Sequence, residues 1–469
     1  MRYLGLALAA ALAAAPARAQ GPTDTLRLTL DAAVQRALSQ SEEVRLARAQ
    51  VDEMNGQVRE AVSTALPQLN GSVTYTRQFA SIFSGLSGGG NNGDTTFSNI
   101  FKNSPFGAPN SWALELTASQ LLFSGGKVGA GLSAAKSARQ AARYNQEEST
   151  TDISFAVRQA YLNAQYRARL LGVAATAIEE TKQQLRQVQL FHQAGTRADY
   201  DLLRAQVDAA NQEPAVVAAA NDYELAMLDL KRLINVPLEQ PLELSTPLIA
   251  EDGTIPVVVE EDLSAAERPA VAAAEATVRV QEQLLKVAKA DRWPTLSVSS
   301  TFSEQAFPSQ ILPFDATFRR NWNAAVKLSV PLFNGLRTEG TVERYRAQLE
   351  RATANRDNVR EQAAIDLTRA KGELQRTQTL LLARRETVEQ ASQAQHIAQV
   401  RYSNGLSTQL EVSDARLLLQ QAEVNEAQAM RDYLMSVAQL EQALGRPVKV
   451  EQRPLEQLRR TIRSEDPNP

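Results

Sequence analysis

The chain has 469 residues, and its 50 basic and 53 acidic side chains give a formal net charge of −3. It contains no cysteine, which excludes disulfides, thiolate metal sites, thiol nucleophiles and a lipid anchor on an N-terminal cysteine. The two histidines are too few for a three-histidine metal site. The balanced charge lacks the basic excess of a nucleic-acid binder. We therefore expect no metal, no cofactor and no nucleic-acid partner.

The first 19 residues have the pattern of a signal peptide. Met1-Arg2 is a short positive segment, an apolar stretch follows from Tyr3 to Ala15, and Ala17-Arg18-Ala19 fits the small-x-small cleavage pattern. About 13 apolar residues are too few to cross a hydrocarbon core of about 30 Å as a helix. No later segment is apolar enough to do so, and entry into a membrane would therefore require strands. The sequence predicts an exported protein that is cleaved before Gln20 and is not lipidated.

The rest of the chain consists of two copies of one sequence unit, although the length of the chain alone suggests about three domains. A shift of 210 residues places Trp112 on Trp322 and Gly195 on Gly405, whereas upstream a shift of 227 places Pro67 on Pro294. The two shifts differ by 17 residues, an insertion in the first copy within a Gly/Asn/Ser-rich run between positions 80 and 110. The predicted divisions are a first repeat over 20–238, a linker over 239–262, a second repeat over 263–450 and a disordered tail over 451–469.

Each copy begins with a helix and continues with two strands. The helices are expected from about Leu30 to Ala65 and from Ser264 to Arg292, ending before Pro67 and Pro294 because proline cannot continue a helix. In the second strand of each copy apolar residues alternate with polar ones, a period typical of a sheet with one apolar and one wet face. The apolar positions are Trp112, Leu114, Leu116 and Ala118 in the first copy, and Trp322, Val326, Leu328 and Val330 in the second. The preceding strands, near positions 69–79 and 296–302, are indicated more weakly.

A very long helix follows the strands in each copy, over about 127–191 and 337–402. Alanine-rich apolar positions recur every three or four residues without a breaker, which is typical of a coiled-coil seam. About 65 helical residues would span roughly 95 Å. The chain reverses at Gly195 or Gly405, and a return helix runs to about Leu233 or Leu444.

The amphipathic strand pairs have two interpretations, a small soluble sheet on a core or part of a membrane barrel. Four strands cannot close a barrel, because the smallest known barrels have eight and open edges are costly in lipid. Two chains would give a filled eight-stranded barrel and three a twelve-stranded barrel with a lumen. The expected fold is mainly α with a small β part: a helical coiled-coil barrel joined to a transmembrane β-barrel of about twelve strands, closed as a trimer.

Several segments resemble the TolC-type outer-membrane efflux proteins. Ser329–Gly335, and Gln120–Gly126 in the first copy, resemble the strand-to-helix junctions of that family. Leu28–Ala33 resembles the family's opening helix, and Arg268-Pro269 resembles the opening of the family's second half. The resemblance implies a homotrimer in contact with outer-membrane lipid of a Gram-negative bacterium and extending into the periplasm. It also implies an exit duct for small molecules, metals or proteins, with an inner-membrane transporter and a periplasmic adaptor of the membrane fusion type as partners. The candidate junction residues are Leu122, Phe123, Gly125, Pro331, Leu332, Phe333 and Gly335.

The same resemblance places a narrow periplasmic aperture at the hairpin tips. In the family an acid six positions after each turn glycine faces the entrance, and here these acids are Asp201 and Glu411, with Asp414 nearby. Acidic rings attract cations and repel anions. In the family, a basic residue two positions after the second glycine helps to hold the closed state through ionic contacts. This chain has Ser407 at that position, whereas Arg197 occupies the equivalent position in the first copy. Without the resemblance, these acids are interpreted as solvated residues at the tip of a coiled coil.

The glycine turns themselves are the candidate adaptor contacts. The resemblance assigns this contact to Gly195 and Thr196 in the first hairpin and to Tyr402, Gly405 and Leu406 in the second. By their residues alone the same turns are ordinary glycine-terminated helix ends.

Enzymatic motifs are incomplete. Gly125-Gly126-Lys127 resembles the end of a phosphate-binding loop, but Val128 replaces the required Ser or Thr and Leu121 stands at the first glycine position. A di-iron bundle needs Glu three residues before each histidine, and glutamine precedes both His192 and His396 there. We therefore expect no enzyme, and both histidines are expected to be solvated. The alternative function is a soluble periplasmic coiled-coil scaffold or adaptor.

Overall fold

The protein is described by a computed structural model that covers residues 25–80, 108–196, 198–249, 254–259, 268–308, 310–314 and 316–454. The predicted signal peptide, most of the Gly/Asn/Ser-rich insertion and Arg197 lie outside these residues. None of the described helices is long and apolar enough to cross a membrane.

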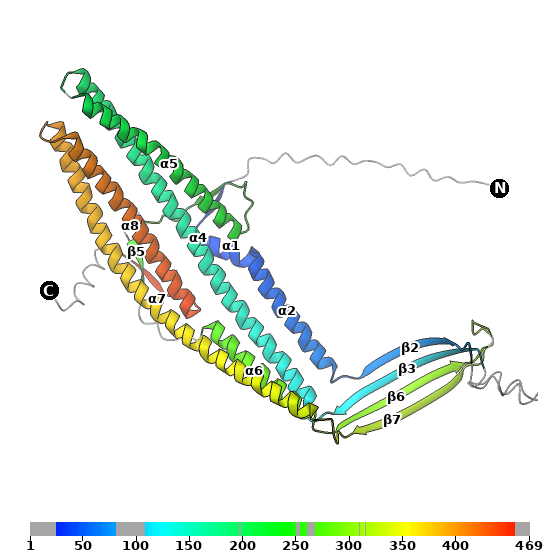
Figure 1. Ribbon diagram of the computed structural model, residues 1–469. Helices are drawn as coiled ribbons and strands as arrows, with labels where there is room; N and C mark the ends of the chain where they lie inside the picture. Colours follow the sequence, from blue (N-terminus) through cyan, green and yellow to red (C-terminus); the bar gives the residue numbers. More distant parts are fainter. Residues whose placement is uncertain are drawn as a thin grey trace, which may run out of the picture.

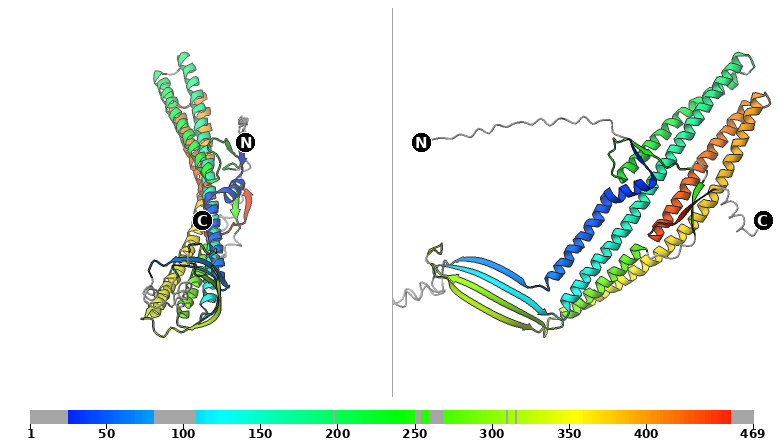
Figure 2. Two further views of the ribbon diagram at one scale, coloured as in Figure 1. Left: turned by 90° about the vertical axis from the view of Figure 1, so that its right-hand side faces the viewer. Right: turned by 180° about the vertical axis from the view of Figure 1, so that it is seen from behind.

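The molecule is elongated, with helical hairpins at one end and a four-stranded sheet at the other (Figure 1). The hairpins consist of α4 (Lys127–Gln193) with α5 (Asp199–Leu233), and of α7 (Arg337–Ser403) with α8 (Gln409–Leu444). The two long helices predicted from the sequence are therefore confirmed. Each has 67 residues, or about 100 Å at the rise of an α-helix. Figure 2 shows that the hairpins form a thin layer when viewed from the side.

The sequence shifts relate the bounds of equivalent helices. The bounds of α2 (Glu42–Ser63) and α6 (Pro269–Ala290) differ by 227 at both ends, and those of α4 and α7 differ by 210 at both ends. The backbone repeats too, since φ is +74° at Gly195 and +73° at Gly405. The long helices and the glycine turns of the two copies therefore fold alike.

The opening helix of the first copy differs from the expectation. Instead of one helix there are two, α1 (Leu30–Gln40) and α2, separated at Ser41, whose extended backbone ends α1. The Ser41 hydroxyl accepts the Val44 N–H at 3.3 Å and caps α2. In the second copy α6 begins at Pro269, a favoured first helical residue, and the expected earlier start lies outside the described residues. Pro67 and Pro294 each stand directly before a strand, as expected.

The four strands form one antiparallel sheet in the order β2-β3-β6-β7, so the two copies meet between β3 and β6. The bounds are Gln68–Arg77 for β2, Asn110–Phe123 for β3, Thr295–Ala306 for β6 and Arg319–Ser329 for β7. These four strands are the ones that the sequence predicted.

The sheet has one apolar and one polar face. Directly opposed residues share a face, and Leu116 lies opposite Phe302, which in turn lies opposite Trp322. On the other face Thr117 lies opposite Asn70 and Thr301. The apolar side chains are not covered by the rest of the chain, since Val73, Trp322 and Val326 are 67%, 77% and 71% exposed.

Two short sheets lie beside the long helices, where the sequence predicted an irregular linker and a disordered tail. Strand β1 (Leu26–Leu28) pairs in parallel with β4 (Leu242–Leu244), and β5 (Thr254–Val258) pairs antiparallel with β8 (Val450–Pro454). The start of the predicted tail is therefore a strand, stabilised by pairing that no local pattern in the sequence indicates. The tail after Pro454 lies outside the described residues.

Buried tyrosines attach these short sheets to the helices. The Tyr161 hydroxyl of α4 donates to the Leu28 carbonyl at 3.0 Å, and the Tyr433 hydroxyl of α8 donates to the Pro256 carbonyl at 2.6 Å. Burial raises the pKa of Tyr433 to about 12, which keeps it protonated as a donor. The main apolar core surrounds these tyrosines in the middle of the helical layer.

Candidate functional site

The first hairpin tip is a glycine turn between α4 and α5. Gly195 has a left-handed backbone, which lets its N–H donate to the His192 carbonyl at 2.9 Å while the Thr196 N–H donates to the Phe191 carbonyl at 3.0 Å. His192 also lies 2.6 Å from an Asp199 carboxylate oxygen, so it links the two helix ends instead of being only solvated. Gly195 and Thr196 are exposed at the tip.

The second tip repeats this turn between α7 and α8. The Gly405 N–H donates to the Tyr402 carbonyl at 3.0 Å and the Leu406 N–H to the Arg401 carbonyl at 2.8 Å. Gly405 and Leu406 are exposed, but Tyr402 is only 1% exposed. The Tyr402 side chain therefore supports the turn from inside, unlike the expected adaptor contact.

The predicted aperture acids lie in or just after the first turns of the return helices. Asp201 and Glu411 are each the third residue of their helix, and the Thr408 hydroxyl accepts the Glu411 N–H at 3.4 Å. Carboxylates at these positions also stabilise the helix dipole. Glu411 and Asp414 are exposed and Asp201 is half-buried. Within the described residues, none of the three acids forms a salt bridge, so their charges are available.

The expected latch position in the second hairpin carries no charge and faces inward. Ser407 is 9% exposed, so no side chain reaches solvent two positions after Gly405. Its first-copy equivalent Arg197 lies outside the described residues.

The strand-to-helix junctions of the two copies have the same backbone and unequal surroundings. Gly125 and Gly335 have φ values of +61° and +63°. A Cβ on Gly125 would collide with Trp293, whereas a Cβ on Gly335 would meet nothing within 4 Å. The apolar residues around them differ in the same direction: Leu122 and Phe123 are 57% and 48% exposed, while Leu332 and Phe333 are 92% and 84% exposed. Pro331 follows the end of β7 by two residues and is exposed.

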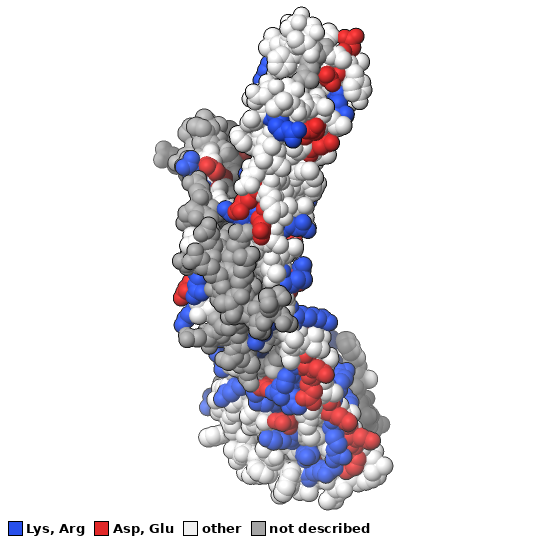
Figure 3. Space-filling model, turned by 90° about the vertical axis from the view of Figure 1, so that its left-hand side faces the viewer, with Lys and Arg blue, Asp and Glu red and all other residues white. Residues whose placement is uncertain are grey.

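Charged residues are unevenly distributed along the α7 side of the molecule. Figure 3 shows basic and acidic side chains crowded together toward the end that carries the sheet and fewer of them toward the tips. The beginning of α7 carries both signs of charge, with Arg337, Arg344 and Arg346 close in sequence to Glu339 and Glu343.

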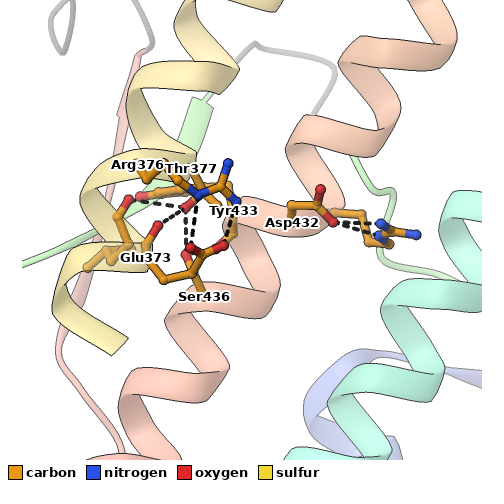
Figure 4. A network of polar contacts seen from close by, with 8 residues as sticks. Glu373, Arg376, Thr377, Asp432, Tyr433 and Ser436 are labelled. Atoms are coloured by element: carbon orange, nitrogen blue, oxygen red, sulfur yellow. Dashed lines mark hydrogen bonds and ion pairs between the residues drawn. The ribbon is translucent and has the colours of Figure 1, made fainter. Parts of the chain in front are cut away.

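Sequence reasoning missed a buried polar network between α7 and α8. The buried Thr377 and Ser436 hydroxyls lie 2.9 Å apart, and the Ser436 hydroxyl donates to the Tyr433 carbonyl at 2.7 Å. Beside them Arg376 donates to both Glu373 carboxylate oxygens (Figure 4). Hydroxyls at helical spacing within an alanine-rich seam are the signal that could have revealed it.

A cleft of about 830 Å³ lies next to this network, between the two hairpins. Its charged lining is balanced, with the basic residues Arg232, Arg376 and Arg431 and the acidic residues Asp229, Glu373 and Asp432. Two of these pairs are already formed, because Arg376 contacts Glu373 and Arg431 contacts Asp432 at 2.5 and 2.6 Å. The cleft therefore presents no net charge to a ligand.

A second unpredicted feature is a group of buried acids on α8. Glu426 is 6% exposed and lies 3.6 Å from Arg385 of α7. Burial raises the pKa of Glu426, an effect that the charges of Arg385 and Arg169 partly offset. Burial likewise raises the pKa of Glu423 and of Glu441. The position of Glu426, four residues from both Ala422 and Met430 on one buried face, was a readable signal.

Comparison with known proteins gives a consistent result. The family model described as "Outer membrane efflux protein" matches residues 33–236 and 262–446. The pyoverdine export outer membrane protein OpmQ of Pseudomonas aeruginosa is 26% identical over 427 residues, which cover 89% of this chain and 85% of the relative. The outer membrane protein VceC of Vibrio cholerae has a similar structure, with a TM-score of 0.73 and 21% identity over 89% of this chain and 96% of VceC. The CmeC outer membrane channel of Campylobacter jejuni gives 0.74 and 18%, over 92% and 88%.

Proposed function

Because the chain belongs to the outer membrane efflux protein family, we propose that it is a passive exit duct that crosses the outer membrane and continues through the periplasm. The protein is a transporter and not an enzyme, as the sequence predicted. In this proposal the energy for transport comes from an inner-membrane transporter, reached through a periplasmic adaptor. The duct itself supplies only a path.

The observation that carries the proposal is the two-faced, open-edged sheet. Its strands have 10 to 14 residues, enough for the 9–11 or so that a membrane-crossing strand needs. One face is apolar and uncovered, while the other presents Ser, Thr and Asn, as lipid and water would require. The edges β2 and β7 are unpaired within the described chain. Three chains would close a barrel of twelve strands around a lumen. Two chains would give eight strands, and side chains would fill the interior of such a barrel.

Membrane fractionation of the exported protein tests this proposal. The duct predicts recovery with the outer membrane as a trimer by native mass, and loss of residues 1–19 from the mature chain. The alternative, a soluble periplasmic scaffold or adaptor, predicts release by osmotic shock. Recovery of the bulk of the protein in the soluble periplasmic fraction would contradict the duct.

The aperture acids are proposed to set ion preference at the periplasmic mouth. In a trimer, Glu411 and Asp414 would place six carboxylates near one axis, with Asp201 adding three more. The exposure of Glu411 and Asp414 supports this role, as does the lack of a salt bridge to any of the three acids among the described residues. Such rings concentrate cations and exclude anions. With an uncharged Ser407, a latch between tips could come only from Arg197 or from contacts other than this position.

Single-channel recording of the double variant Glu411→Ala plus Asp414→Ala tests the aperture. We expect cation preference to fall and block by multivalent cations to weaken, because the ring loses six charges. The matched control is Glu53→Ala plus Glu239→Ala, which removes as much charge at exposed positions far from the tips. Equal selectivity in both double variants would assign the ion preference elsewhere.

The exposed tips are proposed to contact the adaptor. Gly195, Thr196, Gly405 and Leu406 are exposed, and Leu406 is an apolar side chain 70% open to solvent at the end of the molecule. A photo-crosslinker at position 406 should capture an adaptor in intact cells, whereas one at the buried position 402 should not. Capture from both positions alike would show that the tip geometry does not govern the contact.

The substrate class is proposed from the relative. OpmQ of Pseudomonas aeruginosa is named for pyoverdine export, which favours small organic molecules over proteins or metals for this duct. Growth of a strain that lacks this chain, challenged separately with small toxic organics and metal salts, distinguishes these classes. Selective sensitivity to metals would contradict the proposed class.

A further inference from the structure

The end of the four-stranded sheet that lies farthest from the helices (Figure 1) carries a net positive charge. Among the described residues it holds three arginines and one acid, namely Arg77, Arg319, Arg320 and Glu304. In the proposed duct the helices lie in the periplasm, so this end of the sheet lies in the outer leaflet of the outer membrane. The headgroups of that leaflet are phosphorylated glycolipids, which carry the opposite charge.

The two copies differ in charge at one pair of opposed residues in this end. Arg77 of β2 lies opposite Asn110 of β3, and the repeat shifts make them equivalent to Glu304 and Arg320. In the second copy these opposed residues form an ion pair, with Nε of Arg320 2.7 Å from a Glu304 carboxylate oxygen. In the first copy the arginine faces an asparagine, and no carboxylate of the described residues forms a salt bridge with Arg77. The positive charge of Arg77 is therefore uncompensated.

The contacts around Arg77 leave its N–H groups open to an acceptor. Asn110 is 3% exposed, and its amide accepts from the Tyr75 hydroxyl at 2.8 Å and donates to the Pro308 carbonyl at 3.3 Å. The Arg77 guanidinium instead lies over the ring of Phe79, 5.7 Å from its centroid. Such a contact uses the flat face of a guanidinium, whereas the N–H groups lie at its edge. Arg77 itself is exposed.

Arg77 lies on the face of the sheet that would meet lipid. Tyr75, two residues before it in β2, lies opposite Trp112 on the apolar face, and the two rings are 5.1 Å apart. Side chains two residues apart in a strand point to the same face. An arginine on the lipid side of a barrel is costly in the middle of the membrane and is tolerated near its boundary.

The length of β2 places Arg77 at that boundary. Nine residue steps separate it from Gln68 at the helical end of the strand, or about 30 Å along the strand. At a strand tilt of about 40° this corresponds to about 23 Å across the membrane, close to the apolar band of about 25 Å in such barrels. Aromatic residues flank that band, as Tyr75 and Trp112 do here. Arg77 is therefore at the level of the headgroups.

We propose that Arg77 and Phe79 form a binding site for a phosphate group of the outer-leaflet glycolipid, with one site in each subunit. The proposal rests on the proposed duct, which alone places this end of the sheet in that leaflet. A guanidinium presents paired N–H groups that match two oxygens of a phosphate. Phe79 is 90% exposed and lies beside the guanidinium, where its ring contacts the apolar part of the same lipid. The equivalent position in the second copy offers no such site, because Glu304 neutralises Arg320.

Lipid titration of delipidated trimers in detergent tests the site, with native mass spectrometry as the measurement. The probes are diphosphoryl lipid A and lipid A from which both phosphates have been removed. The wild-type trimer should bind the diphosphoryl form more tightly, with up to three molecules in the tight class. Arg77→Gln should weaken binding of the diphosphoryl form about tenfold, because a charge-assisted hydrogen bond is lost, and should leave the dephosphorylated form unchanged. Arg77→Lys keeps the charge and should restore most of the binding.

The matched control is Arg319→Gln. It removes the same charge at the same end of the sheet, but Arg319 lies opposite Gln305 on the polar face. Each variant is compared as a trimer of verified native mass, and Arg319→Gln should bind both lipids like the wild type. The comparison of the two lipids in the wild type needs no substitution, so it decides even where a variant does not assemble.

Two results would overturn the site and leave the duct standing. One is equal affinity of the wild-type trimer for the phosphorylated and dephosphorylated lipids. The other is equal weakening by Arg77→Gln and Arg319→Gln, because binding would then follow the total charge of the sheet end rather than one residue on one face. A wild-type protein recovered as a monomer in the soluble periplasmic fraction would overturn both the site and the duct.

Discussion

Gly125 and Gly335 occupy the same place in the two copies, with the same left-handed backbone, yet only Gly125 has a neighbour. Trp293 lies against Gly125, whereas Gly335 faces open space. Phe123 and Phe333 repeat the contrast with exposed fractions of 48% and 84%. The repeat gives both copies the same elements, but among the described residues only the first-copy junction has a neighbour packed against its glycine. The two junctions therefore differ in their surroundings and not in their backbone.

Substitution of the two junction glycines should change stability more than any other variant considered below. Gly125→Ala adds a Cβ that collides with Trp293 at a left-handed position, and overpacking and backbone strain together should cost about 3 kcal/mol. Gly335→Ala in a dissociated chain should cost only the strain, about 1–2 kcal/mol. Thermal loss of helical circular dichroism on dissociated chains measures both variants.

The two glycine variants should also differ in the assembled protein. If a neighbouring subunit of the proposed trimer covers Gly335, Gly335→Ala should also lower the temperature at which the trimer dissociates. A trimer of Gly335→Ala that dissociates at the wild-type temperature would show that this junction remains uncovered after assembly.

The second effect concerns Arg268 and Ser41, which are equivalent positions before α6 and α2. Arg268 contacts Glu148 and Asp366 at 2.7 and 3.0 Å, largely shielded from water. Arg268→Ala leaves both carboxylates without this cation and should cost about 2–3 kcal/mol, less than a fully buried pair because Asp366 is partly exposed. Ser41→Ala removes only a helix cap and should cost about 1 kcal/mol.

Unfolding midpoints measured in low and high salt distinguish the Arg268→Ala variant from the Ser41→Ala variant. Arg268→Ala should reduce the salt dependence as well as the midpoint, whereas Ser41→Ala should lower the midpoint alone. Equal losses with unchanged salt dependence would show that the ion pairs of Arg268 do not distinguish it from Ser41.

The smallest effect compares Glu423 of α8 with its counterpart Glu213 of α5. Burial raises the pKa of Glu423 in the folded chain, so between its ordinary pKa and the raised one the folded state binds more protons than the unfolded state. Its contribution to stability is therefore present below that window and is lost as pH rises through it. Glu423→Gln should flatten the decline of stability with rising pH, and the exposed Glu213→Gln should not. Equal flattening would contradict the role of burial.

The sequence predicted elements whose signals are local or repeated. The long helices, the turn glycines and the four alternating strands were readable because periodicity and duplication reinforce each other. The split of the first helix at Ser41 was missed although a serine followed by two glutamates is a helix start. The pairing of β5 with β8 depends on segments almost 200 residues apart, which no local pattern specifies.

The candidate site was predicted in part. The positions of Asp201 and Glu411 near the helix starts follow from their spacing after glycine, whereas burial of Tyr402 and Ser407 depends on how the two hairpins pack. The buried Glu426 and the Thr377–Ser436 contact do not follow from composition, and only their positions on the buried helix faces indicate them.

Planar-bilayer recording of the purified wild-type trimer under a salt gradient would show whether this chain forms a conducting path. We expect discrete channel currents with a reversal potential displaced toward that of the cation, because the proposed path passes the acidic mouth formed by Glu411 and Asp414. Absence of channel currents from protein recovered as an outer-membrane trimer would contradict it.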